Sequence, residues 1–130
     1  MTPQIPIRKE NMVSFTQLIA WQEAHVLAIM VYTATRQFPK EELFGITSQL
    51  RRSASSVSAN ISEGFGRSSL KDRSHFYAIA RGSLTETQNH CMLAKDVGIL
   101  AKDSCRELLG KAELVHKLLS GLIRKISEKI

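Results

Sequence analysis

The sequence predicts an all-α protein folded as an antiparallel up-down-up-down four-helix bundle. All three prolines lie within the first 39 residues, so no proline interrupts the chain from Lys40 to Ile130. Apolar residues recur along the chain at steps of three and four, which is the period of one face of an α-helix. Proline or glycine separates the periodic segments, and the short connections make successive helices antiparallel neighbours.

The first helix is expected to start near Ser14 or Thr16 and to run to about Gln37, where Phe38-Pro39 ends it. Its predicted core-facing positions recur at helical spacing: Leu18, Trp21, His25, Ala28, Tyr32 and Thr35. Trp21 and His25 are expected to form a polar-aromatic contact in the core.

The middle of this helix, Val26 to Tyr32, is apolar around its whole circumference. Such a helix needs cover on every side, whereas a lone bundle covers only one. The second side predicts an interface with another copy of the chain, formed by Val26, Ile29, Met30 and Tyr32. The alternative is a helix that is buried entirely within one bundle.

The second helix is expected to begin within Glu41 to Thr47 and to run to about Glu63, with Gly64 and Gly66 closing it. Its predicted seam continues through a serine-rich run: Ile46, Leu50, Ser53/Ala54, Val57 and Asn60/Ile61. Small residues on its faces indicate close packing rather than a linker.

The third helix is expected from a cap at Ser68 or Ser69 to about Asp96, with Gly98 ending it. Gly82 falls in its middle, at a cost of about 1 kcal/mol relative to alanine, which we expect close approach of another helix to offset. The fourth helix is expected from Lys102 to Lys129. Its apolar positions alternate by four and three: Leu108, Ala112, Val115, Leu119, Leu122 and Ile126.

Length and composition indicate one globular domain, with residues 1–13 as a flexible tail and 14–130 as the bundle. Neither a signal-peptide core nor a stretch of about 20 apolar residues is present, and Cys91 and Cys105 form no CxxC pair. We therefore expect a cytoplasmic protein without a membrane partner.

The second helix carries a pattern that resembles a known family. Gly45-Ile-Thr-Ser-Gln-Leu-Arg-Arg52 and Ser56-Val-Ser-Ala-Asn60-Ile-Ser-Glu-Gly64-Phe-Gly-Arg67 are similar to the four-helix bundle proteins encoded in intervening sequences of bacterial 23S ribosomal RNA genes. Phe38-Pro39 and Ala80-Arg-Gly-Ser-Leu-Thr-Glu86 extend the resemblance. Ser58 stands where that family commonly has proline, which puts the path of the second helix in question, and Ala101 stands where a capping serine or threonine is usual.

The resemblance implies a homo-oligomer, typically a pentamer, while the residues themselves leave four, five or six copies open. It also extends to the accessory proteins of diversity-generating retroelements, which implies association with a reverse transcriptase and nucleic acid. The family implies no cofactor and no assigned activity.

The formal net charge of +6 favours a polyanionic partner such as RNA or DNA, because phosphate binding needs basic side chains on one surface. The alternative is a solvated basic surface. The candidate nucleic-acid-binding residues are Arg51, Arg52, Arg67, Lys71, Arg73, Arg81, Lys111, Lys117, Arg124, Lys125 and Lys129. At least one of Arg51 and Arg52 is expected to pair with Glu63 or Glu86 instead.

Asn60, Glu63 and Glu86 lie on or beside seam positions and predict a structural polar network rather than an acid-base pair. Glu113-Leu-Val-His116 has the Glu-x-x-His spacing of di-iron bundles, but the second motif and the further glutamates that such a site needs are missing. We predict no metal and no catalytic residue.

Three functions remain open. The preferred one is a non-catalytic oligomeric scaffold whose basic surface engages nucleic acid or a nucleic-acid enzyme. The second is a structural protein-protein adaptor with no nucleic-acid role, and the third is a metal-dependent bundle enzyme.

Overall fold

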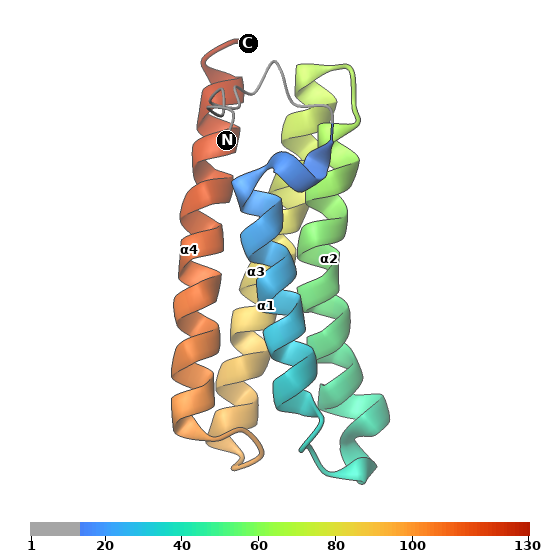
Figure 1. Ribbon diagram of the computed structural model, residues 1–130, viewed down its shortest axis with the longest axis vertical. Coiled ribbons are helices and arrows are strands. Elements are labelled where there is room, and N and C mark those ends of the chain that lie inside the picture. The colour runs from blue at the N-terminus through green and yellow to red at the C-terminus, as the bar shows by residue number, and fades with distance from the viewer. Residues whose placement is uncertain (1–13) are drawn as a thin grey trace, which may run out of the picture.

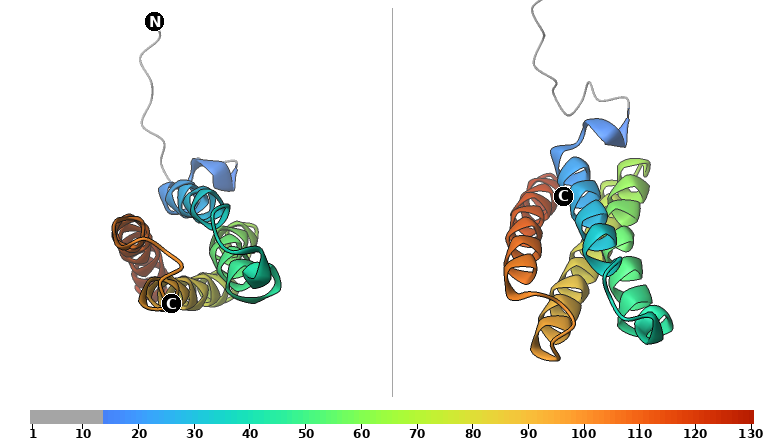
Figure 2. Two further views of the ribbon diagram at one scale, coloured as in Figure 1. Left: turned by 90° about the horizontal axis from the view of Figure 1, so that it is seen from below. Right: turned by 60° about the horizontal axis from the view of Figure 1, so that its bottom comes forward.

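The computed structural model describes residues 14–130, so the predicted tail at 1–13 lies outside the described part of the chain. Its four α-helices are α1 (Ile19–Thr35), α2 (Ser48–Phe65), α3 (Leu70–Asp96) and α4 (Lys102–Ser127). They run alternately in opposite directions and form the corners of a square, in which α1 and α3 each pack against both α2 and α4 (Figures 1 and 2). The predicted bundle is confirmed.

A short 3-10 turn, Phe15–Gln17, precedes α1 and is capped by Ser14, whose hydroxyl accepts from the Thr16 N–H at 3.2 Å. The core face of α1 agrees only in part with the predicted one, since Leu18, Ala28 and Thr35 are buried as expected. The seam consists of small and aliphatic residues: Ala20, Ala24, Leu27, Ala28, Val31 and Thr35.

Trp21 and His25 stack with ring centroids 4.8 Å apart, but His25 is exposed and Trp21 only half-buried, so their contact lies at the surface. Tyr32 is exposed as well. The prediction of a core contact was wrong because an all-apolar helix offers the same three-four spacing on two faces. Alanines on one face let the neighbouring helices come closer than indole and imidazole rings allow.

The chain does not enter the second helix directly. A 3-10 turn (Lys40–Glu42) and a π-helical turn (Leu43–Thr47) intervene, and the helical geometry breaks at Gly45 (φ −109°, ψ −117°). Because this linking segment stands outside the bundle (Figure 1), Leu43 is left exposed and Phe44 is 91% exposed. The sequence had suggested only a helix start here.

The helix α2 is continuous through Ser58, whose hydroxyl donates to the Ser55 carbonyl at 3.2 Å, so the position that is commonly proline in the family carries no break. Gly66 caps the helix in a right-handed conformation (φ −78°). Gly64 is buried, and a Cβ atom there would lie 2.7 Å from Cε1 of Tyr77. Gly64 therefore allows α2 and α3 to approach.

The ends of α3 and α4 follow the predicted signals. Ser69 caps α3 by accepting the Asp72 N–H at 3.1 Å, and Gly98 beyond α3 has φ +83°, which glycine adopts freely. Ala101 precedes α4 without a side-chain cap. The expected close approach at Gly82 is wrong for the described residues 14–130, because a Cβ there would meet none of their atoms within 4 Å.

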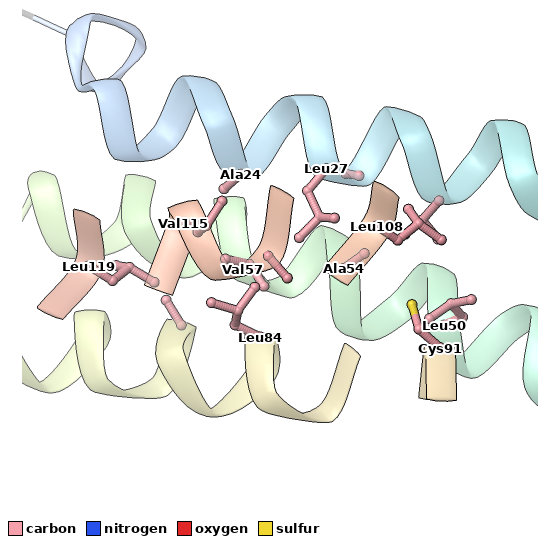
Figure 3. Close-up of a cluster of buried hydrophobic side chains, with 14 of the residues drawn as sticks. Ala24, Leu27, Leu50, Ala54, Val57, Leu84, Cys91, Leu108, Val115 and Leu119 are labelled. Atoms are coloured by element: carbon pink, nitrogen blue, oxygen red, sulfur yellow. The ribbon is translucent and has the colours of Figure 1, made fainter. Parts of the chain in front are cut away.

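Aliphatic side chains from all four helices fill the centre of the bundle (Figure 3). Leu27, Val57, Leu84 and Val115 are fully buried and come from α1, α2, α3 and α4 in turn. Two buried hydroxyls pair within this core, since Thr87 donates to Ser53 at 2.9 Å. Among residues 14–130, no helix is both long enough and apolar enough to cross a bilayer.

Replacing Tyr77 with phenylalanine should stabilise the protein by about 1 kcal/mol. The Tyr77 hydroxyl is buried and has no hydrogen-bond partner within residues 14–130. Burial raises its pKa, an effect that Arg73 opposes in part. Urea unfolding followed by circular dichroism measures the change, and Tyr32→Phe at an exposed ring is the control. A loss of stability at Tyr77 alone would reveal a partner for the hydroxyl.

Candidate functional site

Basic side chains gather at one end of the bundle, where α2 ends, α3 begins and α4 ends (top of Figure 1). We call this the basic end, and it comprises six of the eleven predicted basic residues: Arg67, Lys71, Arg73, Arg124, Lys125 and Lys129. Three acidic residues, Glu63, Asp72 and Glu128, accompany them, which leaves a net charge of +3. The bundle thus brings together two basic segments that are separated by about 50 residues in the sequence.

The turn between α2 and α3 fixes two of these arginines. Arg67 pairs with Glu63 at 3.2 Å, and its guanidinium carbon lies 4.6 Å from the centroid of the Phe76 ring. Arg73 donates from Nε and Nη2 to the Arg67 carbonyl, at 3.2 and 3.0 Å. Ordered guanidinium groups lose less conformational entropy when they bind an anion.

Four lysine and arginine side chains at the same end are exposed and form no ion pair among residues 14–130: Lys71, Arg124, Lys125 and Lys129. Arg124 and Lys125 belong to the last turn of α4, where positive charge also interacts favourably with the helix dipole, and Lys129 follows just beyond it. These side chains are available to phosphate groups.

The other five predicted basic residues lie along the sides of the bundle, and four of them have partners within the chain. Arg51 donates from Nε to the Thr35 hydroxyl at 2.8 Å, with its guanidinium 4.7 Å from the centre of the Tyr32 ring. Arg52 pairs with Glu86. These two arginines therefore tie α2 to α1 and α3, as was expected of at least one of them.

Lys111 and Lys117 are paired as well. Lys111 lies 2.6 Å from Glu23 and so joins α4 to α1, while Lys117 lies 3.8 Å from Glu113 on its own helix. Arg81 is half-buried on the side of α3.

The opposite end of the bundle is electrically balanced. Five basic residues occur there: Arg36, Lys40, Lys95, Lys102 and Arg106. Five acidic residues accompany them: Glu41, Glu42, Asp96, Asp103 and Glu107. The two ends of the bundle therefore differ in charge, and the positive charge is concentrated at the basic end. Composition alone does not show this difference.

Asn60, Glu63 and Glu86 do not form one network. Asn60 donates to the Ser56 carbonyl at 2.8 Å, while Glu63 is exposed and pairs with Arg67. Glu86 accepts from Arg52 and His90. Desolvation alone would raise the Glu86 pKa, but these hydrogen bonds outweigh it and lower that pKa.

The polar contacts between α2 and α3 instead involve hydroxyls: the buried pair Ser53 with Thr87, and the half-buried pair Ser56 with Ser83 at 2.9 Å. These pairs could not be predicted from the sequence, because a serine at a seam position looks the same whether it packs as a small residue or pairs across a helix contact.

The outer face of α1 carries the predicted oligomer-interface residues. Val26, Ile29 and Tyr32 are exposed, with 52% of the Ile29 surface accessible, and Met30 is half-buried. The Arg51 guanidinium lies over the Tyr32 ring, whereas Val26 and Ile29 are left exposed to solvent.

A groove of ≈ 330 Å³ adjoins this face between the end of α1 and the start of α4. We call it the α1–α4 groove, and its apolar lining is Ile29, Met30, Ala34, Phe38, Ile99, Leu100, Ala101 and Leu108.

Metal-ligating and nucleophilic side chains are scattered in the described part of the chain. Among residues 14–130, no three histidine, cysteine, aspartate or glutamate side chains cluster where they could hold a metal ion. Glu113 pairs with Lys117, and His116 is exposed. Burial, reinforced by Cys105, raises the pKa of the Cys91 thiol to about 12, which leaves it protonated and unreactive near neutral pH.

The fold and these surfaces define a small all-α bundle protein with one basic end and one exposed apolar helix face. The family model described as 23S rRNA-intervening sequence protein matches residues 16–121. The chain belongs to this family.

A solved structure supports the same fold. It is a protein of unknown function from the S23 ribosomal protein family of Bacteroides thetaiotaomicron VPI-5482, with a TM-score of 0.73 and 19% sequence identity. The match covers 81% of this chain and 98% of that one. No curated protein matches this chain.

Proposed function

We propose that this protein is a non-catalytic, homo-oligomeric scaffold that binds RNA or DNA through the basic end. The concentration of charge at that end carries the proposal. Six basic side chains stand against three acidic ones there, while the opposite end is balanced. Two arginines are held in place and four further cations are exposed without a partner among residues 14–130, which suits contacts to a phosphate backbone.

Binding of this kind reads backbone charge rather than base sequence. The basic end combines helix ends and a turn, and its cations are not arranged as a helix or strand that enters a groove. A nucleic-acid enzyme such as a reverse transcriptase would then be brought to the protein by the polynucleotide they share, as the resemblance to retroelement accessory proteins implies.

Oligomerisation strengthens the proposed binding. Assembly that covers the outer face of α1 brings several basic ends together, so a modest charge per chain becomes a large collective field. The resemblance favours five copies.

The test is salt-dependent binding of a fluorescently labelled 30-nucleotide RNA of mixed sequence, followed by anisotropy, with light scattering of the same samples. We expect an intact oligomer that binds at low salt, with log K falling linearly as log salt rises. An intact oligomer that leaves the RNA free at 25 mM salt would contradict the nucleic-acid role.

The second candidate function is an adaptor for another protein. The exposed Phe44 and the α1–α4 groove favour it, and both lie at the end of the bundle opposite the basic end. Affinity capture before and after nuclease treatment separates the two functions, because only a protein adaptor retains its partner once nucleic acid is digested. Elemental analysis that finds stoichiometric iron, manganese or zinc would favour the third candidate, a metal-dependent enzyme.

A further inference from the structure

The linking segment between α1 and α2 presents an apolar projection that the chain itself leaves uncovered. Phe44 is 91% exposed and Leu43 beside it is exposed too; we call this pair the apolar knob. The break in helical geometry at Gly45 holds the pair outside the bundle. A phenylalanine side chain left in water forgoes about 1.5–3 kcal/mol of burial energy, so the knob points to a contact surface.

The α1–α4 groove is suited to receive such a projection. Eight of its twelve lining residues are apolar, and it has a volume of ≈ 330 Å³. Knob and groove lie at the same end of the bundle but on different sides of it, since the linking segment stands beyond α2 while the groove lies between α1 and α4 (Figure 2). One copy therefore cannot fill its own groove with its own knob.

The apolar surface is continuous between the two features. Ile29 belongs to the groove, and Tyr32, one turn further along α1, borders Leu43 in a depression between α1 and α2. The knob alone would bury about 150–250 Å², which is well below the area of a stable protein interface. A larger contact needs the groove and the outer face of α1 as well, and these form one extended surface with the knob.

One pair of opposite charges matches across the two features. The linking segment carries Lys40 followed by Glu41 and Glu42, and Glu107 lines the groove. Neither Lys40 nor Glu107 forms an ion pair within residues 14–130. Lys40 of one copy can therefore pair with Glu107 of the next at the rim of the contact.

We propose that the apolar knob of one copy docks in the α1–α4 groove of the next copy, in a head-to-tail contact that closes into a ring. This inference rests on the homo-oligomer proposed above and names the surfaces that form it. Different surfaces meet at such a contact, and it closes when successive copies are related by rotation without translation. Knob and groove at the same height along the bundle meet that condition.

The arrangement has a consequence for the basic ends. In a head-to-tail ring whose axis runs along the bundles, every copy points the same way, so all basic ends share one rim. A two-fold dimer of antiparallel bundles would place them at opposite ends instead.

The test begins with Phe44→Ser, which changes an exposed side chain and should leave the helix content unchanged. Loss of the buried ring should weaken each contact roughly 10- to 100-fold, so light scattering should show smaller species over a range of concentrations. Leu93→Ser on α3 is the matched control, since Leu93 is equally apolar and 50% exposed but lies outside the knob and the groove. The control should assemble like the wild type.

Mixing two defective variants tests the head-to-tail geometry. Phe44→Ser lacks the knob, and Ile29→Glu places a charge in the groove. Each should be a monomer alone, but their mixture should form a one-to-one heterodimer through the single contact that stays intact. Monomers that remain monomers on mixing would overturn the head-to-tail contact.

The outcomes separate the inference from the function it rests on. If the wild type is a monomer at high concentration, both the oligomer and the contact are wrong. If the wild-type oligomer survives Phe44→Ser with its size unchanged, only the knob-in-groove contact is wrong.

Discussion

Replacing Arg124, Lys125 and Lys129 with glutamine should weaken binding of a 30-nucleotide RNA at least about 100-fold at 0.1 M salt. Each phosphate contact to a single strand contributes about 0.7 to the slope of log K against log salt, so losing three contacts removes about two logarithmic units at that concentration. The slope itself should fall by about 2 per copy engaged. Glutamine keeps the helix propensity of α4 close to that of lysine and arginine.

The matched control removes the same charge from the opposite end of the bundle, with Lys95, Lys102 and Arg106 replaced by glutamine. These residues accompany acidic neighbours, with Lys95 3.4 Å from Asp96. RNA affinity should change less than about 3-fold. Equal losses in both variants would mean that the protein responds to its net charge and that the basic end has no special role.

Replacing Gly64 with alanine should destabilise the protein by about 2–3 kcal/mol. The added Cβ would lie 2.7 and 2.9 Å from two ring carbons of Tyr77, and 3.1 Å from Cβ of Phe76. The Tyr77 ring is fully buried, so it cannot move aside without shifting α3 relative to α2. Thermal and urea unfolding measure the loss.

Gly82→Ala provides the comparison within one helix pair. A Cβ at Gly82 meets nothing within 4 Å, so the substitution should stabilise α3 by about 0.5–1 kcal/mol. Similar effects at both glycines would show that packing at Gly64 is looser than the structure indicates. A loss at Gly82 that depends on protein concentration would place this surface between copies.

Helix ends were predicted well where a single residue determines the local backbone conformation. Ser69 and Gly98 fix the ends of α3 through a side-chain cap and a positive φ angle, and both are residues that favour those conformations locally. The four-three spacing of α4 likewise identified most of its buried face, including Leu108, Val115 and Leu119.

Prediction was weaker wherever two faces looked alike. The first helix is apolar on both sides, so periodicity could not decide whether the alanines or the aromatic residues face the core. Gly64 near the end of α2 and Gly82 in the middle of α3 show a similar ambiguity. A glycine in a helix indicates close approach only when the opposing side chain is large and buried, as Tyr77 is at Gly64, and that side chain comes from another helix.

The candidate site depended on tertiary arrangement. The sequence places Arg51 and Arg52 in one candidate set with Arg67, although the length of α2 separates them. The concentration of charge emerges only when the last turns of α4 meet the α2–α3 turn. The projection of Phe44 was missed because Leu43-Phe44-Gly45 reads equally as the first turn of a helix.

The hydroxyl pairs and the close contact at Gly64 join α2 and α3 along most of their length, and only residues 66–69 connect these helices. A short connection makes the entropic cost of bringing its two ends together small. This hairpin is therefore expected to form early when the chain folds, before α1 docks from across the longer stretch at residues 36–47. The helix that exposes the most apolar surface is then the last to be secured, so newly made chains would meet their neighbours through α1 while the remainder of the bundle is already in place.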